Sequence, residues 1–74
     1  VKRKGELTMN IADRIQYLRK QKGYSQEELA DKVGVSRQAV SKWESGASDP
    51  STTNLMALAK LFGVTAEEIL VIRN

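Results

Sequence analysis

Apolar residues recur along this chain at the three- and four-residue spacings of amphipathic helices. The clearest stretch places four of them at i, i+3, i+4 and i+7, namely Leu55, Leu58, Ala59 and Phe62. Residues at these spacings lie on one face of a helix. No stretch alternates apolar and polar positions with the β-branched and aromatic residues of a strand. The pattern therefore predicts an all-α chain.

Start and stop signals divide the chain into five predicted helices. The first runs from about Asn10 to Lys22. The other four begin after residues suited to cap a helix, namely Ser25, Ser36, Ser51 and Thr65. Ser25 with Glu28, and Thr65 with Glu68, have the spacing of a capping box. A glycine follows each of the first four helices, where the left-handed conformation of a C-terminal stop favours it.

The second and third predicted helices are joined only by Gly34 and Val35. A joint this short favours two helices that cross at a steep angle, which is the helix-turn-helix arrangement. The small side chain of Ala30 allows the third helix to approach closely, and Val35 can turn inward and hold the joint. Residues 26–45 are therefore predicted to form a helix-turn-helix.

The third predicted helix has a polar face with the chemistry of a DNA-reading surface. If Val40 points inward, Gln38 and Lys42 lie on the opposite side, Ser41 lies at the flank, and Arg37 sits in the first turn. Arg and Lys can donate to guanine, and Gln can pair with adenine, in the major groove. An ordinary solvated helix face is the competing interpretation. Trp43 is expected to pack in or beside the core rather than to stack on a base.

Composition narrows the possible functions. A chain of 74 residues allows one domain, and it contains neither cysteine nor histidine. It therefore lacks thiol chemistry, the commonest general base and the commonest metal ligand. No cofactor, metal, catalytic residue or small-molecule substrate is predicted, and we expect that the protein is not an enzyme. No apolar run reaches the roughly 20 residues that span a membrane.

The net charge of +3 is unevenly distributed. Residues 1–22 carry seven Lys or Arg against two acidic residues, whereas the remainder is close to neutral. This bias suggests attraction to a polyanion, although a solvated, Lys-rich helix face is equally compatible with it. Residues 1–9 are expected to be a flexible basic extension before a domain at 10–74. Because Met9 lies just before the first helix, residues 1–8 are either a native extension or a remnant of cloning.

Several segments of this chain together resemble the Cro/cI (Xre) family of helix-turn-helix regulators. From Gln26 onward, apolar residues occupy the places expected of lambdoid repressors and Cro proteins, namely Leu29, Val33, Val35, Val40 and Trp43. The wider similarity runs through GYSQEELA, VSRQAVSKWESG, Pro50, LMALAKLFGV and AEEIL, and covers about Asn10 to Leu70. The resemblance implies a compact five-helix, lambda-repressor-like domain from a prokaryotic or phage regulator, with repression as the expected role.

The resemblance also implies roles for individual residues. It implies base contacts by four residues, namely Arg37, Gln38, Ser41 and Lys42, and a phosphate contact by Gln26, which in the family often also supports the reading face. Three hydroxyls complete the candidate backbone contacts, namely Ser36, Ser45 and Ser48. The loop after the third helix departs from the family pattern, since it lacks the basic residues that many phage repressors carry there. The basic residues 2–4 are candidates to make phosphate contacts in place of that loop.

A structural ion pair and a dimer contact are implied in the same way. Matching family positions predict a partly buried salt bridge between Arg19 and Glu44; alternatively, Arg19 contacts phosphate. The apolar candidates for a two-fold contact are Met56, Leu61, Val71 and Ile72. They would form a homodimer on a palindromic double-stranded DNA operator, or would pack on a further C-terminal domain.

Alternatives of other classes remain open at this stage. The same fold could serve as a protein-interaction module, such as an antitoxin or coactivator domain, or as the DNA-binding domain of a longer regulator. The chain shows no secretory signal and no membrane segment. We therefore expect a cytoplasmic, nucleoid-associated protein.

Overall fold

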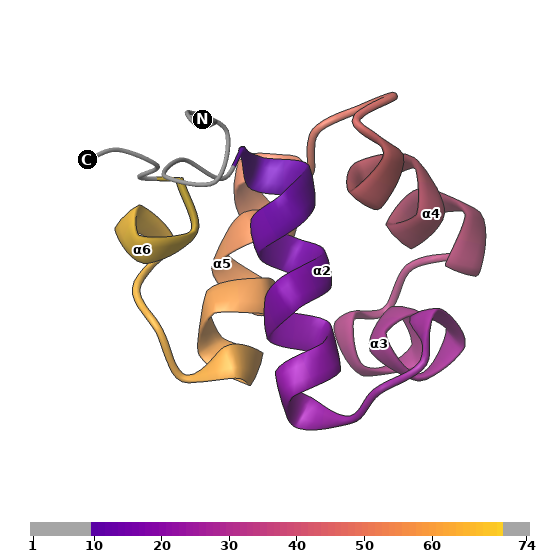
Figure 1. The fold of residues 1–74 in the computed structure, drawn as a ribbon, viewed down its shortest axis with the longest axis horizontal. Helices are drawn as coiled ribbons and strands as arrows, with labels where there is room; N and C mark the ends of the chain where they lie inside the picture. Colours follow the sequence, from indigo (N-terminus) through magenta and orange to yellow (C-terminus); the bar gives the residue numbers. More distant parts are fainter. Residues whose placement is uncertain (1–9, 71–74) are drawn as a thin grey trace, which may run out of the picture.

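The computed structural model describes residues 10–70, which form five α-helices and, within that range, no strand (Figure 1). The helices are α2 (Ile11–Lys22), α3 (Gln26–Val33), α4 (Arg37–Ser45), α5 (Thr52–Phe62) and α6 (Ala66–Leu70). The all-α, five-helix prediction is confirmed. Asn10, expected at the start of the first helix, is its N-cap, and its side chain accepts a hydrogen bond from the Asp13 N–H.

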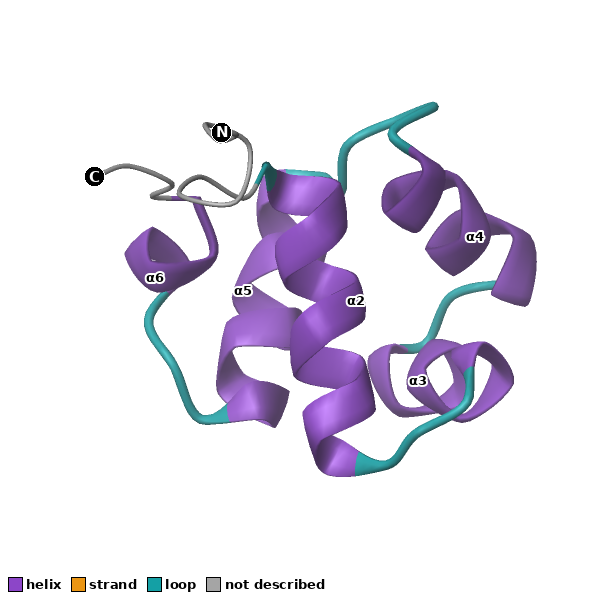
Figure 2. Ribbon diagram, viewed as in Figure 1, coloured by secondary structure: helices purple, strands orange, loops and turns teal. Residues whose placement is uncertain are grey.

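Helix α2 lies at the centre of the arrangement. Figure 2 shows α3 and α4 on one side of α2, and α5 and α6 on the other. The helix-turn-helix thus projects from one flank of a small helical scaffold. No helix in residues 10–70 is long and apolar enough to cross a membrane.

The predicted caps are present. Ser25 and Glu28 form a reciprocal capping box, with hydrogen bonds of 3.0 and 2.8 Å. Thr65 and Glu68 do the same, at 3.0 and 2.8 Å. Each box satisfies two backbone N–H groups that have no partner within the first turn of a helix. The caps therefore fix where α3 and α6 begin, as the sequence predicted.

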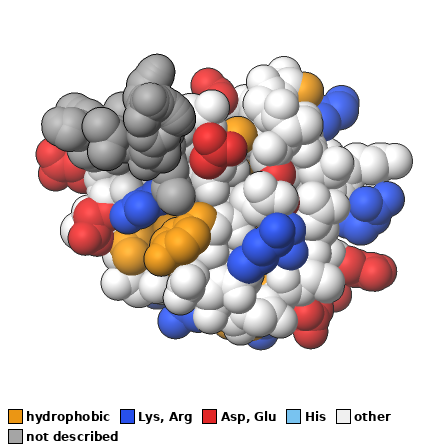
Figure 3. Space-filling model, viewed as in Figure 1, with side chains coloured by type: hydrophobic (Ala, Val, Ile, Leu, Met, Phe, Trp, Pro, Cys, Tyr) orange, Lys and Arg blue, Asp and Glu red, His pale blue; other side chains and the backbone are white. Residues whose placement is uncertain are grey.

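The outside of the domain mixes charges of both signs. On the face shown in Figure 3, Lys and Arg lie among Asp and Glu without forming a large area of one sign. Residues 10–70 contain eight Lys or Arg and eight Asp or Glu, so this part of the chain is formally neutral. The net charge of +3 therefore comes from the residues that flank it.

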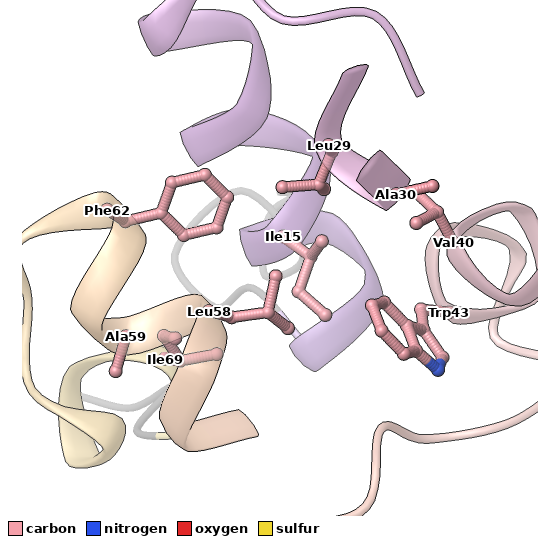
Figure 4. Packing of buried hydrophobic residues seen from close by; sticks show 9 residues of the cluster. All are labelled: Ile15, Leu29, Ala30, Val40, Trp43, Leu58, Ala59, Phe62 and Ile69. Atoms are coloured by element: carbon pink, nitrogen blue, oxygen red, sulfur yellow. The ribbon is translucent and has the colours of Figure 1, made fainter. Parts of the chain in front are cut away.

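One hydrophobic cluster holds the five helices together (Figure 4). Its buried members are Ile15, Leu29, Ala30, Val40, Trp43, Leu58, Ala59, Phe62 and Ile69. Trp43 is 4% exposed, which confirms that it belongs to the core. Only Val40 and Trp43 of α4 are buried. The position of α4 consequently depends on those two side chains, on the partly buried Ala39, and on the polar contacts that α4 makes with other helices.

Candidate nucleic-acid interface

The turn between α3 and α4 is fixed by its backbone. Gly34 has φ +85°, and the N–H groups of Gly34 and Val35 both donate to the Ala30 carbonyl, at 2.8 and 2.9 Å. Val35 is partly buried against the core, as expected. Ser36 then caps α4 by accepting a hydrogen bond from the Ala39 N–H at 3.1 Å. The short joint therefore places the start of α4 directly after a hydrogen-bonded turn.

Helix α4 divides its side chains between the core and solvent. Because Val40 and Trp43 are buried, three of the four predicted reading residues, Arg37, Gln38 and Lys42, are exposed. Ser41 is only partly exposed, since it lies at the flank of the same helix. The structure thus gathers the predicted residues on an outward surface, with Ser41 at its edge.

The predicted ion pair between Arg19 and Glu44 is present. Arg19 donates from Nε to Glu44 Oε2 at 2.6 Å and from Nη2 to Oε1 at 3.0 Å. Its Nη1 donates to the Tyr24 carbonyl at 2.8 Å. The two side chains are 11% and 3% exposed. All three guanidinium nitrogens are thus bonded within the protein, which favours the structural interpretation over a phosphate contact.

The hydrogen bond to Glu44 also sets the protonation behaviour of Arg19. That hydrogen bond raises the pKa of the Arg19 guanidinium; burial works in the opposite direction, and the charge of Glu44 adds to the increase. Because the charged form is the one that the carboxylate binds, Arg19 stays protonated throughout the neutral range.

A second partner of Glu44 was not predicted from the sequence. The side-chain amide of Gln26 donates from Nε2 to Glu44 Oε1 at 3.1 Å. The family resemblance implied that Gln26 contacts phosphate and supports the reading face, and it assigned Glu44 to Arg19 alone. No local pattern signals this contact, because the two residues are 18 positions apart and lie on different helices. It exists only once α3 and α4 have packed.

The candidate hydroxyl groups differ in what they have left to donate. The Ser45 hydroxyl donates to the Lys42 carbonyl at 3.2 Å and accepts from the Ala47 N–H at 3.3 Å. Its proton is therefore already used inside the protein. Ser36 is exposed and its oxygen accepts a bond as the N-cap, so its O–H can still donate. Ser48 is also exposed.

In the loop after α4, the first backbone N–H groups are already bonded within the protein. The N–H groups of Ala47 and Ser48 both donate to the Lys42 carbonyl, at 2.9 and 3.3 Å. With no basic side chain in residues 46–51, the loop cannot supply the cationic grip seen in the family pattern. The backbone N–H groups of Ala47 and Ser48 do not replace the missing basic side chains, because they are already bonded.

The predicted dimer residues fall into three groups. Met56 is 61% exposed on α5, whereas Leu61 is partly buried against the core. Val71 and Ile72 lie outside the described residues. Leu70, which precedes them, is 45% exposed, whereas Ile69 is fully buried. The last two apolar residues of α6 therefore lie on different faces of the helix.

Comparison with known proteins places this geometry in context. Residues 15–69 match the family described as Helix-turn-helix. The HTH-type transcriptional activator BcrR of Enterococcus faecalis is 44% identical over 62 residues, which span 84% of this chain and 30% of that protein. An uncharacterized HTH-type transcriptional regulator of Methanocaldococcus jannaschii is 41% identical over 61 residues, 82% of this chain and 92% of that one. The chain thus spans less than a third of BcrR but nearly all of the second relative.

A solved structure shows the same arrangement of helices. The P22 c2 repressor, in complex with a synthetic operator, is similar with a TM-score of 0.81 and 35% sequence identity. The match covers 85% of this chain and 96% of that one. The likeness therefore includes the scaffold and the helix-turn-helix together.

Proposed function

The chain belongs to the helix-turn-helix family, in its Cro/cI (Xre) branch, and on that premise we propose that it binds double-stranded DNA sequence-specifically and regulates transcription. The observation that carries the proposal is the surface of α4. Two buried apolar residues anchor this helix, and its exposed side bears Arg37, Gln38 and Lys42. The similar P22 c2 repressor was solved on an operator, which supports DNA as the ligand.

Base recognition is assigned to α4 in the major groove. Arg37 and Lys42 would donate to the O6 and N7 atoms of guanine, and Gln38 would pair with the N6 and N7 atoms of adenine. Ser41, at the edge of the surface, would contact either kind of base. The N-terminal half of α4 would enter the groove first, since that is how the second helix of this motif docks.

Backbone contacts are assigned to the start of α3 and to nearby hydroxyls. Gln26 is the first residue of α3, where backbone N–H groups without intrahelical partners favour an anion. Ser36 and Ser48 are the better-placed hydroxyl donors. Ser45 would first have to release its bond to the Lys42 carbonyl. These contacts would set the register of the domain on the duplex without reading its sequence.

Repression by occupancy of a palindromic operator is the proposed mode of action. A homodimer would place two copies of α4 in half-sites about 34 Å apart. Met56 is the exposed candidate for the two-fold contact, with Leu61 beside the core as a secondary one, and Val71 and Ile72 remain proposed partners. Residues 1–9 would act as a basic extension to the domain at 10–74. Such a protein would work in the cytoplasm, on the nucleoid, and would not be an enzyme.

In-vitro selection of duplex DNA from a random library is the direct test. We expect a palindromic site to be enriched, with a half-site spacing near one helical turn, and we expect a footprint on both half-sites. Sedimentation of the complex should give two chains per duplex. A library that shows no enriched sequence, together with a stable protein partner, would instead favour an interaction module of the same fold.

A further inference from the structure

Trp43 is buried as a ring but not as a hydrogen-bond donor. The residue is 4% exposed and packs in the hydrophobic cluster. Within residues 10–70, its indole Nε1–H donates to no acceptor. That nitrogen is also not fully enclosed, so the N–H edge of the ring reaches the surface. Figure 4 shows the nitrogen on the side of the ring that faces away from the other labelled side chains.

The indole N–H of Trp43 is a donor with a fixed direction. The indole group can donate one hydrogen bond and accept none, and a buried tryptophan usually has a partner for it. Because Trp43 and Val40 are the buried residues that anchor α4, the ring cannot turn toward another acceptor without repacking the core. The acceptor must therefore come from outside the domain, either from solvent or from a ligand.

This donor lies at the C-terminal end of α4, where few other groups can hold an anion. Residues 46–51 contain no Lys or Arg. The N–H groups of Ala47 and Ser48 are already bonded to the Lys42 carbonyl, at 2.9 and 3.3 Å. These bonds cover part of the negative end of the helix, which would otherwise repel an anion. The indole N–H therefore remains available at a place where the backbone N–H groups are not.

The place of Trp43 on α4 favours the DNA backbone over the bases. Lys42 is exposed among the reading residues, and Trp43 follows it, turned by about 100° round the helix toward the core. With α4 in the major groove, the outward side chains reach base edges at the floor of the groove. A ring edge that emerges beside the core instead faces the wall of the groove, which phosphates line.

We propose that the indole N–H of Trp43 donates a hydrogen bond to a phosphate oxygen of the bound duplex. The inference rests on the proposed function and adds a contact to those assigned there. A neutral donor holds a phosphate without supplying charge, so it strengthens binding without adding to the release of counterions. Because the ring is part of the core, the contact also ties the position of the backbone to that of α4.

The test removes the N–H and keeps the ring. The chain has a single tryptophan, so an analogue incorporated during expression replaces Trp43 alone. Benzothienylalanine carries sulfur in place of the N–H and has nearly the same shape. Dissociation constants are measured on the selected site and on random-sequence duplex DNA. We expect binding to both to weaken about tenfold, with their ratio and the salt slope unchanged.

Ring-fluorinated tryptophan, which keeps the N–H, is the matched control and should bind as the parent chain does. Equal binding by benzothienylalanine protein and parent chain would overturn the proposal and leave DNA binding intact. A loss confined to the selected site would also overturn it, because a phosphate contact reads no sequence. If the parent chain binds neither duplex at low salt, the proposed function fails, and this contact fails with it.

A second readout follows the indole proton in the parent chain and decides the matter if the analogue does not fold. With one tryptophan, the protein gives one indole signal in a nitrogen–proton NMR spectrum. We expect this proton to exchange rapidly with water in the free protein and more slowly in complex with either duplex. Slow exchange in the free protein would reveal a partner inside the domain and overturn the proposal. Exchange that DNA does not slow would overturn it as well.

Discussion

At the scale of single residues, α4 separates its buried apolar side chains from its exposed polar ones. Val40 is fully buried, whereas Gln38 and Lys42, two positions away on either side, are exposed. Helical geometry places such residues on opposite sides, so a change on one side leaves the other intact. Substitutions on the exposed side should therefore alter DNA recognition without unfolding the domain.

We expect Gln38→Ala or Arg37→Ala to weaken binding to the selected site by roughly 1–3 kcal/mol and to relax specificity at the base that each contacts. The reason is that a side chain paired with a base edge discriminates against the wrong base. Fluorescence anisotropy titrations on the site and its single-base variants measure both effects. Gln21→Ala is the control. Losses of the same size on random DNA would contradict base reading.

The ion pair gives a second residue-scale prediction. Arg19→Met should lower the free energy of unfolding by about 3 kcal/mol, because it leaves the 3%-exposed Glu44 carboxylate with Gln26 as its only side-chain partner. Chemical denaturation measures the change. The neighbouring, exposed Lys20→Met should alter stability by less than about 0.5 kcal/mol. Similar effects from both variants would show that Arg19 contributes no more to stability than the exposed Lys20.

The pH dependence of this contribution follows from the pKa of Arg19. Since the folded-state pKa is raised, the stabilisation is complete below the ordinary arginine pKa and is lost only as the pH rises through the raised value. The difference in the free energy of unfolding between Arg19→Met and the parent chain should therefore be the same at neutral and mildly alkaline pH, as far as it depends on the titration of Arg19. A difference that fades over that range would conflict with the observed bond.

At the scale of elements, the helices are too short to be stable alone. Helix α3 has eight residues, α4 has nine and α6 has five, whereas isolated helices below roughly 12–15 residues are marginal in water. Caps and packing must therefore supply their stability. The turn between α3 and α4 is the critical connection, because it sets where the reading helix begins.

Gly34 provides the test of that turn. A Cβ atom at Gly34 would meet nothing within 4 Å, but the φ of +85° is strained for other residues. We expect Gly34→Ala to lower the free energy of unfolding by about 1 kcal/mol for conformational reasons alone. Gly34→Asn should lose less, because Asn tolerates the left-handed region better. Urea midpoints measure both. An alanine variant as stable as the parent chain would show that the turn can adopt another conformation.

At the scale of the whole molecule, the excess of positive charge lies outside residues 10–70 of the sequence. Residues 10–70 are formally neutral, and residues 1–9 carry Lys2, Arg3 and Lys4 against Glu6 alone. A neutral domain gains little from long-range attraction to DNA. We therefore expect the non-specific affinity for DNA to depend on the flanking residues more than on residues 10–70.

The salt dependence of DNA binding tests which residues provide the non-specific affinity. We expect log Kobs to fall linearly with log salt, because each neutralised phosphate releases counterions. Replacing Lys2, Arg3 and Lys4 together by Ser should reduce the magnitude of this slope by up to about 3 if all three contact phosphates. Lys60→Ser, at an exposed position in the last turn of α5, is the control for a lost charge and should leave the slope unchanged. A triple variant with the parent slope would assign the grip to residues 10–70 instead.

The sequence alone determined the features that depend on near neighbours. Helix periodicity, the two capping boxes and the glycine stops involve residues within about four positions of one another, so they can be read without a fold. The same periodicity predicted that Trp43 is in the core and that Gln38 and Lys42 are outside. The position of Arg19 opposite Glu44 came from the family resemblance, because nothing local connects the two residues.

Only the tertiary structure decided the contacts between distant residues. The bond from Gln26 to Glu44 and the partial burial of Leu61 both depend on how the helices pack. A sequence pattern fixes the face on which a side chain lies, but not which partner reaches that face from another helix. For the helix-turn-helix, the sequence thus determined which residues face outward on α4, and the packed scaffold determined the contacts that hold α4 in position.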